Sequence, residues 1–190
     1  QVPDRATLGR VIASHESTRL QQRRLLPIYI PTGIHIETLT LDAANDLMLT
    51  GAIWQRFGED VPGDVPKTFR FANASRVSVT NVTQYSQGSE TVVLSSFEAA
   101  VRQNLDFTSY PLDQALLTLR VLPAEIDERV ALVPDMDGYR LLAPSALPGL
   151  DPGVSLAGWR VLQSFFGLRD QRSYSSLGLE QSLDAIQSPD

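Results

Sequence analysis

The chain opens with a segment of helical periodicity. Asp4–Leu26 places apolar side chains near one face at helical spacing, Asp4 or Thr7 can cap its start, and Pro27 ends it. The spacing predicts an amphipathic helix within residues 1–27. We interpret the lone histidine on this stripe as a packed side chain rather than a ligand. The residues expected on the packed face are Leu8, Val11, Ile12, His15 and Leu20.

After the helix, apolar and polar residues alternate with a period of two, which is typical of half-buried strands. Within the first strand the apolar phase shifts between Ile36 and Leu39, which predicts a β-bulge. Many short strands separated by turn signals predict an all-β sandwich of about ten strands in residues 28–190. The expected strands include Ile28–Leu41, Leu47–Phe57, Val77–Tyr85, Thr91–Val101, Ala115–Leu122, Arg129–Val133 and Leu156–Phe166.

The most informative loop is Leu105–Asp113, with the sequence LDFTSYPLD. Its centre is Tyr110-Pro111, where the proline fixes its own φ and keeps the tyrosine out of the helical region. Its apolar residues are too many to remain in water, so we expect the loop to pack against one end of a sheet. An ordinary strand connection with a hydrophobic plug would show the same spacing.

LDFTSYPLD resembles the signature loop between the sixth and seventh strands in the extracellular domain of pentameric ligand-gated ion channels, the Cys-loop receptor superfamily. In that family an acidic-aromatic pair is followed by aromatic-Pro-apolar-Asp, as in Asp106-Phe107 and Tyr110-Pro111-Leu112-Asp113. Animal members close the loop with a disulfide. The corresponding positions are Gln103 and Leu117, so the chain is similar to the bacterial members, which lack that bond.

The resemblance covers nearly all of Ile28–Tyr174 in order. It includes Phe69–Asn73 and Gly158-Trp159, which are similar to further elements of the family. Val65-Pro66-Lys67 stands where the family has a Trp-containing motif, which speaks against an aromatic box of the neurotransmitter type at that corner. The resemblance implies an immunoglobulin-like β-sandwich whose relatives bind small ligands between neighbouring subunits.

The resemblance also implies two sets of functional residues. The signature loop faces the pore domain in the family, and its matching residues here are Asp106, Phe107, Tyr110, Pro111 and Asp113. A ligand site would combine Trp54 and Phe57 on one face with residues from the opposite face of a neighbouring subunit. Those residues are Asp135, Tyr139, Arg172 and Tyr174. Because Arg172 repels a cation and can hold an anion bidentately, we expect an anionic or amphiphilic small molecule.

Composition and charge narrow the possible activities. A formal net charge of −6 without a basic stripe argues against nucleic acid as a partner. The absence of cysteine excludes a disulfide scaffold and thiolate metal sites, and His15 and His35 belong to no metal-ligand pattern. We interpret Asp135 and Asp137 as a solvated turn rather than a catalytic pair. With no hydrolase, dinucleotide or P-loop motif, we expect no enzyme, cofactor or metal.

The expected function is that of an extracytoplasmic ligand-sensing domain in a bacterial pentameric ligand-gated ion channel-like membrane protein, on the periplasmic or extracellular face. The alternative is a periplasmic sensor domain of a non-channel signalling or transport-associated receptor. Leu177–Asp190 does not match the tenth strand that leads into the membrane in the family. The resemblance implies a homo-oligomer in the full-length protein, and we expect a monomer or weak dimer for the isolated domain.

Overall fold

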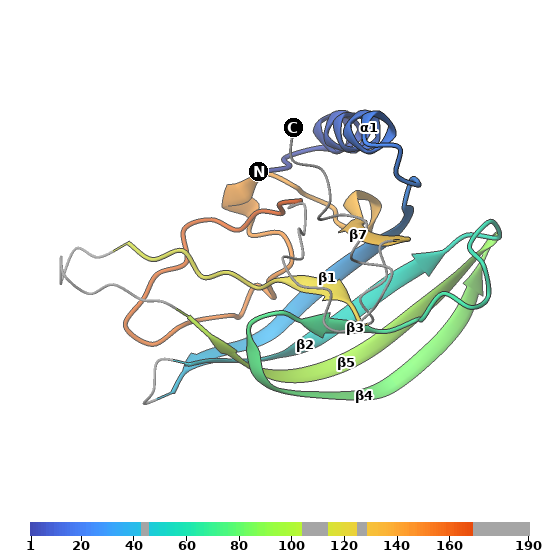
Figure 1. Ribbon diagram of the computed structural model, residues 1–190. Coiled ribbons are helices and arrows are strands. Elements are labelled where there is room, and N and C mark those ends of the chain that lie inside the picture. Colours follow the sequence, from blue (N-terminus) through green and yellow to red (C-terminus); the bar gives the residue numbers. More distant parts are fainter. Residues whose placement is uncertain (43–45, 104–113, 125–128, 169–190) are drawn as a thin grey trace.

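The computed structural model describes residues 1–42, 46–103, 114–124 and 129–168, and these residues are mostly β with one N-terminal helix and a large sheet (Figure 1). The helix, α1, spans Arg5–Gln21, so the predicted helix is confirmed but ends before Leu26. Asp4 caps it, because its Oδ1 accepts a hydrogen bond of 2.7 Å from the Thr7 N–H. The chain leaves the helical region at Arg23, where φ is 54°.

One face of α1 is half-buried, as the stripe predicts, with the exception of Leu20. Leu20 is 60% exposed. It follows Ile12 by eight residues, which rotates it by about 80° around the helix axis and off the packed face.

The main sheet has the strand order β4-β5-β2-β1-β7. Its strands pair antiparallel, except that β7 runs parallel to β1. A hairpin turn joins β4 and β5, with Gly88 at φ 64°. The strands are β1 (Ile28–Leu41), β2 (Asp46–Phe57), β4 (Ala74–Gln87), β5 (Glu90–Arg102) and β7 (Val130–Pro134).

The predicted bulge in β1 is confirmed, because the register between β1 and β2 shifts between Ile36 and Thr38. The extra residue lets Ile36 and Leu39, three positions apart, both lie buried on the same face. Gly51 lies opposite this point, and a Cβ there would be 2.1 Å from the backbone oxygen of His35. The close approach of the two backbones explains why glycine occupies this position.

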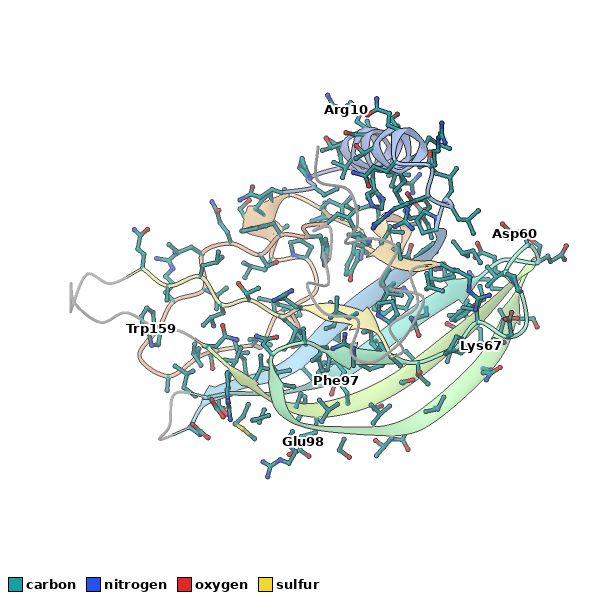
Figure 2. The ribbon with its side chains drawn as sticks, in the orientation of Figure 1. Arg10, Asp60, Lys67, Phe97, Glu98 and Trp159 are labelled. Atoms are coloured by element: carbon teal, nitrogen blue, oxygen red, sulfur yellow. The ribbon has the colours of Figure 1, made fainter. Side chains whose placement is uncertain are left out.

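A second layer covers one face of the sheet. Its strands, β3 (Phe69–Phe71) and β6 (Val121–Pro123), pair antiparallel. Phe69 and Phe71 pack against Phe97 of β5, with ring centroids 5.0 to 6.5 Å apart. Phe97 and its neighbour Glu98 point to opposite sides of the sheet, so only one of them enters the core (Figure 2). This aromatic cluster is the centre of the main core.

A second, smaller cluster lies on the same face of the sheet. Its buried members are Ile30, Phe57, Val65 and Val93. Phe57 is only 4% exposed, and Lys67 lies over its ring at 5.6 Å from the centroid. The loop between β2 and β3 supplies Val65 and closes this end of the core.

Two expected strands are wrong in extent. Ala115–Leu122 forms a strand only from Val121, and Leu156–Phe166 forms no regular strand. In the latter, Leu156 and Trp159 are joined by an isolated bridge around Gly158, whose φ is 78°. Alternating apolar residues anchor these segments to the core, and no strand among the described residues continues the ladder beside them.

Five apolar side chains on the alternating segments, where packing between two sheets predicts mostly buried positions, are only partly buried. Four of them, including Trp159, pack against the edge of the main core, while Leu94 lies on the other face of the sheet. Trp159 does not lie on a helix. The described residues form seven strands in all. The five residues are Leu94, Leu117, Leu119, Val121 and Trp159.

Candidate functional site

On the face of the sheet opposite the main core, a polar cluster forms around Asp135. The residue follows β7 and is 3% exposed. Its Oδ2 accepts one hydrogen bond from Trp54 Nε1 and one from Arg56 Nε, each of 2.7 Å. Because a strand places residues i and i+2 on the same face, Trp54 and Arg56 reach the carboxylate together. The buried negative charge is thus paired with a cation and hydrogen-bonded.

Arg56 extends the cluster towards the β4–β5 hairpin. Its Nη1 donates to Gln87 Oε1 at 2.9 Å and to Glu90 Oε2 at 3.5 Å. The hydrogen bond to Asp135 raises the pKa of Arg56 above its usual value, so the guanidinium keeps its charge. Asp135 Oδ1 also accepts from the backbone N–H of Asp137 at 3.2 Å. Among the described residues, the cluster therefore contains one cation, Arg56, and two carboxylates, those of Asp135 and Glu90.

Two glycines hold the indole of Trp54 in place. A Cβ on Gly33 of β1 would lie 2.0 Å from Trp54 Cζ2, and a Cβ on Gly138 would lie 2.5 Å from the same atom. Gly138 ends η1, the 3₁₀ turn at Met136–Gly138. Any larger residue at either position would displace the ring. The indole therefore lies in a slot that Gly33 of β1 and Gly138 of η1 leave open by lacking side chains.

Tyr139 follows η1 and contacts both the indole and the edge of β1. Its ring centroid is 5.4 Å from that of Trp54. Its hydroxyl accepts from the Ile34 N–H at 2.7 Å and donates to the Ile34 carbonyl at 2.9 Å. Burial raises the pKa of Tyr139 far above its usual range. The pairing of β7 with β1 ends at Thr32. Just beyond that point, the neutral phenol forms the hydrogen bonds with Ile34 that a neighbouring strand would otherwise form.

The N-terminal segment joins the same region. The Val2 N–H donates to the Phe166 carbonyl at 2.8 Å, and the Phe166 ring lies 4.8 Å from that of Tyr139. Arg5, at the start of α1, forms an ion pair with Asp137. These contacts link the N-terminus, η1 and the Trp54 slot.

The residues on either side of Leu105–Asp113 are joined by side-chain hydrogen bonds. Gln103 Nε2 donates to the Thr118 carbonyl at 3.1 Å, and the Thr118 N–H donates to Gln103 Oε1 at 3.0 Å. Asn73 Nδ2 also donates to the Thr118 carbonyl at 3.0 Å. Thr118 follows Leu117, so these hydrogen bonds join the chain just after β5 to the segment that leads into β6. The predicted loop residues Asp106, Phe107, Tyr110, Pro111 and Asp113 lie outside the described residues.

The structure brings together three of the six predicted ligand residues, Trp54, Asp135 and Tyr139, and does so within one chain. Phe57 lies on the opposite face of β2 from Trp54 and is buried in the second cluster. The expectation of a shared face for Trp54 and Phe57 is therefore wrong, because residues three apart on a strand face opposite sides. Arg172 and Tyr174 lie outside the described residues.

The interpretation of Asp135 as a solvated turn residue is also wrong, whereas Asp137 is exposed as expected. Sequence reasoning missed Arg56, Gly33 and Gly138. The i, i+2 spacing of Trp54 and Arg56 is a signal that would have placed the arginine beside the indole. Nothing local in the sequence indicates that the two glycines meet the same ring.

Comparison with known proteins finds no matching family model and no matching curated protein. Among the described residues, no group of three or more His, Cys, Asp or Glu could hold a metal ion. No helix in the described part of the chain is long and apolar enough to cross a membrane.

Proposed function

We propose that the chain is the extracytoplasmic ligand-sensing domain of a bacterial membrane protein of the pentameric ligand-gated ion channel type. The proposal includes an immunoglobulin-like sandwich of about ten strands. The sequence resemblance over Ile28–Tyr174 supports it, and so does the mostly β fold with one N-terminal helix.

One observation carries the proposal. Trp54 and Asp135, which the resemblance assigns to a ligand site, are 81 positions apart in sequence and joined by a 2.7 Å hydrogen bond. Tyr139, assigned to the same site, packs beside the indole. A cluster of aromatic rings with a few fixed polar groups is the usual composition of a small-molecule site.

The charges of the cluster bear on the class of ligand. Asp135 and Arg56 neutralise each other, and Glu90 adds a further negative charge. The described residues of the cluster therefore offer no excess positive charge to an anion. In the proposal, Arg172 supplies that charge and Tyr174 adds a further ring, so the ligand is a small aromatic or amphiphilic carboxylate.

Fluorescence titration of the isolated chain tests ligand binding. In a Trp159→Phe background the emission reports on Trp54 alone, since the chain has two tryptophans. Benzoate is expected to change the emission in a saturable way, and Arg172→Ala is expected to weaken the effect about tenfold or more. Arg160→Ala removes a positive charge from an exposed position and is the matched control. Tight binding of tetramethylammonium that survives both Arg172→Ala and Tyr174→Ala would refute the assignment.

A second function has one specific observation in its favour. Trp54, Asp135 and Tyr139 meet inside a single chain, so this part of a ligand site needs no neighbouring subunit. That arrangement also suits a periplasmic sensor domain of a non-channel receptor. An ion-flux assay on the full-length polypeptide in liposomes separates the two functions. Ligand-dependent flux supports the channel, and ligand binding without flux supports the sensor.

A further inference from the structure

The two edges of the main sheet differ in how their backbone is covered. On one side, β7 pairs with the first part of β1, and the Tyr139 hydroxyl satisfies both backbone groups of Ile34. The Ile36 N–H then donates to the Gly149 carbonyl at 2.8 Å, and its carbonyl accepts from the Asp151 N–H at 2.8 Å. Irregular chain thus continues the hydrogen bonding of β1 where its neighbouring strand ends.

The other edge of the sheet is β4, and among the described residues only β5 pairs with it. The strand is 14 residues long, and almost every side chain on it is exposed. Figure 1 shows β4 as the outermost strand, on the opposite side of the sheet from α1. An edge strand carries a row of unpaired N–H and C=O groups that can template another strand.

β4 lacks most of the features that protect edge strands. It contains no proline or lysine, and Arg76 is its only charged residue. In the part of the chain that the structure describes, its protection is limited to two register shifts against β5, which divide the strand into shorter stretches. One shift lies between Ala74 and Arg76, and the other lies between Thr80 and Thr83.

Between the two shifts, the five residues Arg76–Thr80 keep one continuous register with β5. Valine and threonine, which favour extended backbone, make up most of this stretch. Val77 is 39% exposed and Val79 is 42% exposed, so both offer apolar surface to a neighbouring strand. Arg76–Thr80 is therefore the part of β4 that is best suited to pair with another chain.

We infer that β4 is a self-association site, at which the Arg76–Thr80 stretch pairs antiparallel with the same stretch of a second copy around a two-fold axis at Ser78. That axis places Val77 of each copy opposite Val79 of the other, on the face that β4 shares with Ala99 and Phe97. The partner is a second copy because the same strand then supplies complementary backbone and apolar side chains on both sides.

Charge favours contact at this stretch rather than elsewhere on the surface. The molecule carries a formal net charge of −6, so most approaches between two copies bring like charges together. The pairing stretch carries a single charge, that of Arg76, and the axis places it opposite the uncharged Thr80, so pairing here brings no like charges directly opposite each other. Because five residue pairs bury less area than a standard interface, the dimer is weak, with a Kd on the order of 100 μM. The inference is independent of the proposed ligand site.

Analytical ultracentrifugation from about 10 μM to 1 mM measures the association. The unmodified chain is expected to shift from monomer to dimer over this range. Val79→Lys is expected to weaken dimerisation at least about tenfold, because two added charges approach each other across the axis. Leu26→Lys is the matched control, since Leu26 is 44% exposed and lies outside the sheet, and it should leave the Kd within about twofold. A chain that stays monomeric at the highest concentration overturns the inference.

Single cysteines test the register without relying on a destabilising change. Because the chain has no cysteine, one introduced thiol can form a disulfide only with another copy. Directly opposed residues in an antiparallel pair have Cα atoms within disulfide range, so Ser78→Cys should cross-link fastest when diamide is added as oxidant. Arg76→Cys and Thr80→Cys test the flanking positions, and Ser155→Cys is an exposed control. A maximum at any position other than Ser78, or a rate equal to that of Ser155→Cys, overturns the inference.

Discussion

At the scale of single residues, the Asp135 carboxylate organises the candidate site. Asp135 is almost completely buried, and its Oδ2 depends on donors from Trp54 and Arg56. Removing one member of a buried ion pair leaves the other charge without compensation, whereas removing both leaves no such charge. The free energy of unfolding is therefore expected to fall more when one member of the Asp135–Arg56 pair is replaced than when both are replaced together.

Asp135→Asn is expected to lower the free energy of unfolding by about 3 kcal/mol, because Arg56 then loses its buried partner. The measurement is urea denaturation at pH 7. Asp137→Asn breaks an ion pair whose acidic side chain is 61% exposed, so this control should cost less than about 1 kcal/mol. Combining Asp135→Asn with Arg56→Gln should recover part of the loss. Equal losses for Asp135→Asn and Asp137→Asn would show that the buried pair is not a stabilising contact.

Two glycine substitutions are expected to have opposite signs. Gly33→Ala should destabilise the fold by about 1 to 3 kcal/mol, because the new methyl group meets the Trp54 ring. Gly9→Ala should stabilise it by up to about 1 kcal/mol, since the added Cβ in α1 meets no other atom within 4 Å and alanine favours the helix. Thermal unfolding measures both, and Trp54 emission should shift only for Gly33→Ala. A neutral Gly33→Ala with unchanged emission would contradict the slot around the indole.

Tyr139 gives the stability a dependence on alkaline pH. The folded protein holds the phenolic proton more tightly than the unfolded chain, because burial raises the pKa of Tyr139. Its contribution is therefore fully present below about pH 10 and is lost as the pH rises further. Tyr139→Phe should remove this part of the loss of stability at alkaline pH. At pH 7 the same change should lower the free energy of unfolding by about 1 to 3 kcal/mol, since Ile34 loses its hydrogen-bonding partner.

Urea denaturation at pH 7 and at about pH 10.5 measures the effect of Tyr139. Tyr85→Phe is the control, because Tyr85 is 47% exposed. An unchanged alkaline loss in Tyr139→Phe would show that other groups account for it. Tyr29 has a raised pKa for the same reason, so Tyr29→Phe should also reduce the alkaline loss.

At the scale of elements, hydrogen bonds from polar side chains hold irregular segments in place where no strand pairing does so. Gln103, just after β5, forms two hydrogen bonds with the backbone of Thr118. A neutral amide thus joins the end of β5 to the segment before β6, with Asn73 as a second donor to the Thr118 carbonyl.

Gln103→Ala is expected to lower the free energy of unfolding by about 1 to 2 kcal/mol and to expose the Thr118 amide to exchange. Hydrogen exchange resolved to single residues gives the second readout. Gln114→Ala changes an exposed glutamine on the same connection and should affect neither quantity. If the Thr118 amide stays protected in Gln103→Ala, the side-chain bond does not hold the loop base.

At the scale of the whole molecule, two hydrophobic clusters share one sheet. The larger contains Phe97, the smaller contains Phe57, and strands β1, β2 and β5 contribute to both. Because these strands are continuous through both clusters, the clusters are expected to unfold together.

Phe97→Ala and Phe57→Ala are therefore each expected to cost about 3 to 5 kcal/mol and to keep a single transition. Trp54 fluorescence and far-ultraviolet circular dichroism should give the same midpoint for each variant. Leu162→Ala removes a side chain that is 60% exposed and should have little effect. Two separate transitions in either variant would show that the clusters are independent units.

The sequence by itself determined the elements whose signals are local. The alternation of apolar and polar residues identified the long strands. The capping residue at its start identified α1, and the change of apolar phase after Ile36 located the bulge. These features follow from side-chain direction and backbone geometry over a few residues. The named site residues also included Trp54, Asp135 and Tyr139, although their direct contact within one chain was not expected.

Only the tertiary structure decided which groups complete each element. Alternation of apolar and polar residues indicates that one face of a segment is buried, but not whether the segment pairs with another strand. The prediction of a strand at Leu156–Phe166 was wrong for that reason. The burial of Asp135 depends on Arg56, 79 positions away, and the edge of β1 depends on Tyr139, 105 positions from Ile34. Hydrogen bonds and charge pairs over such separations leave no periodic trace in a single sequence, because only the folded chain brings their partners together.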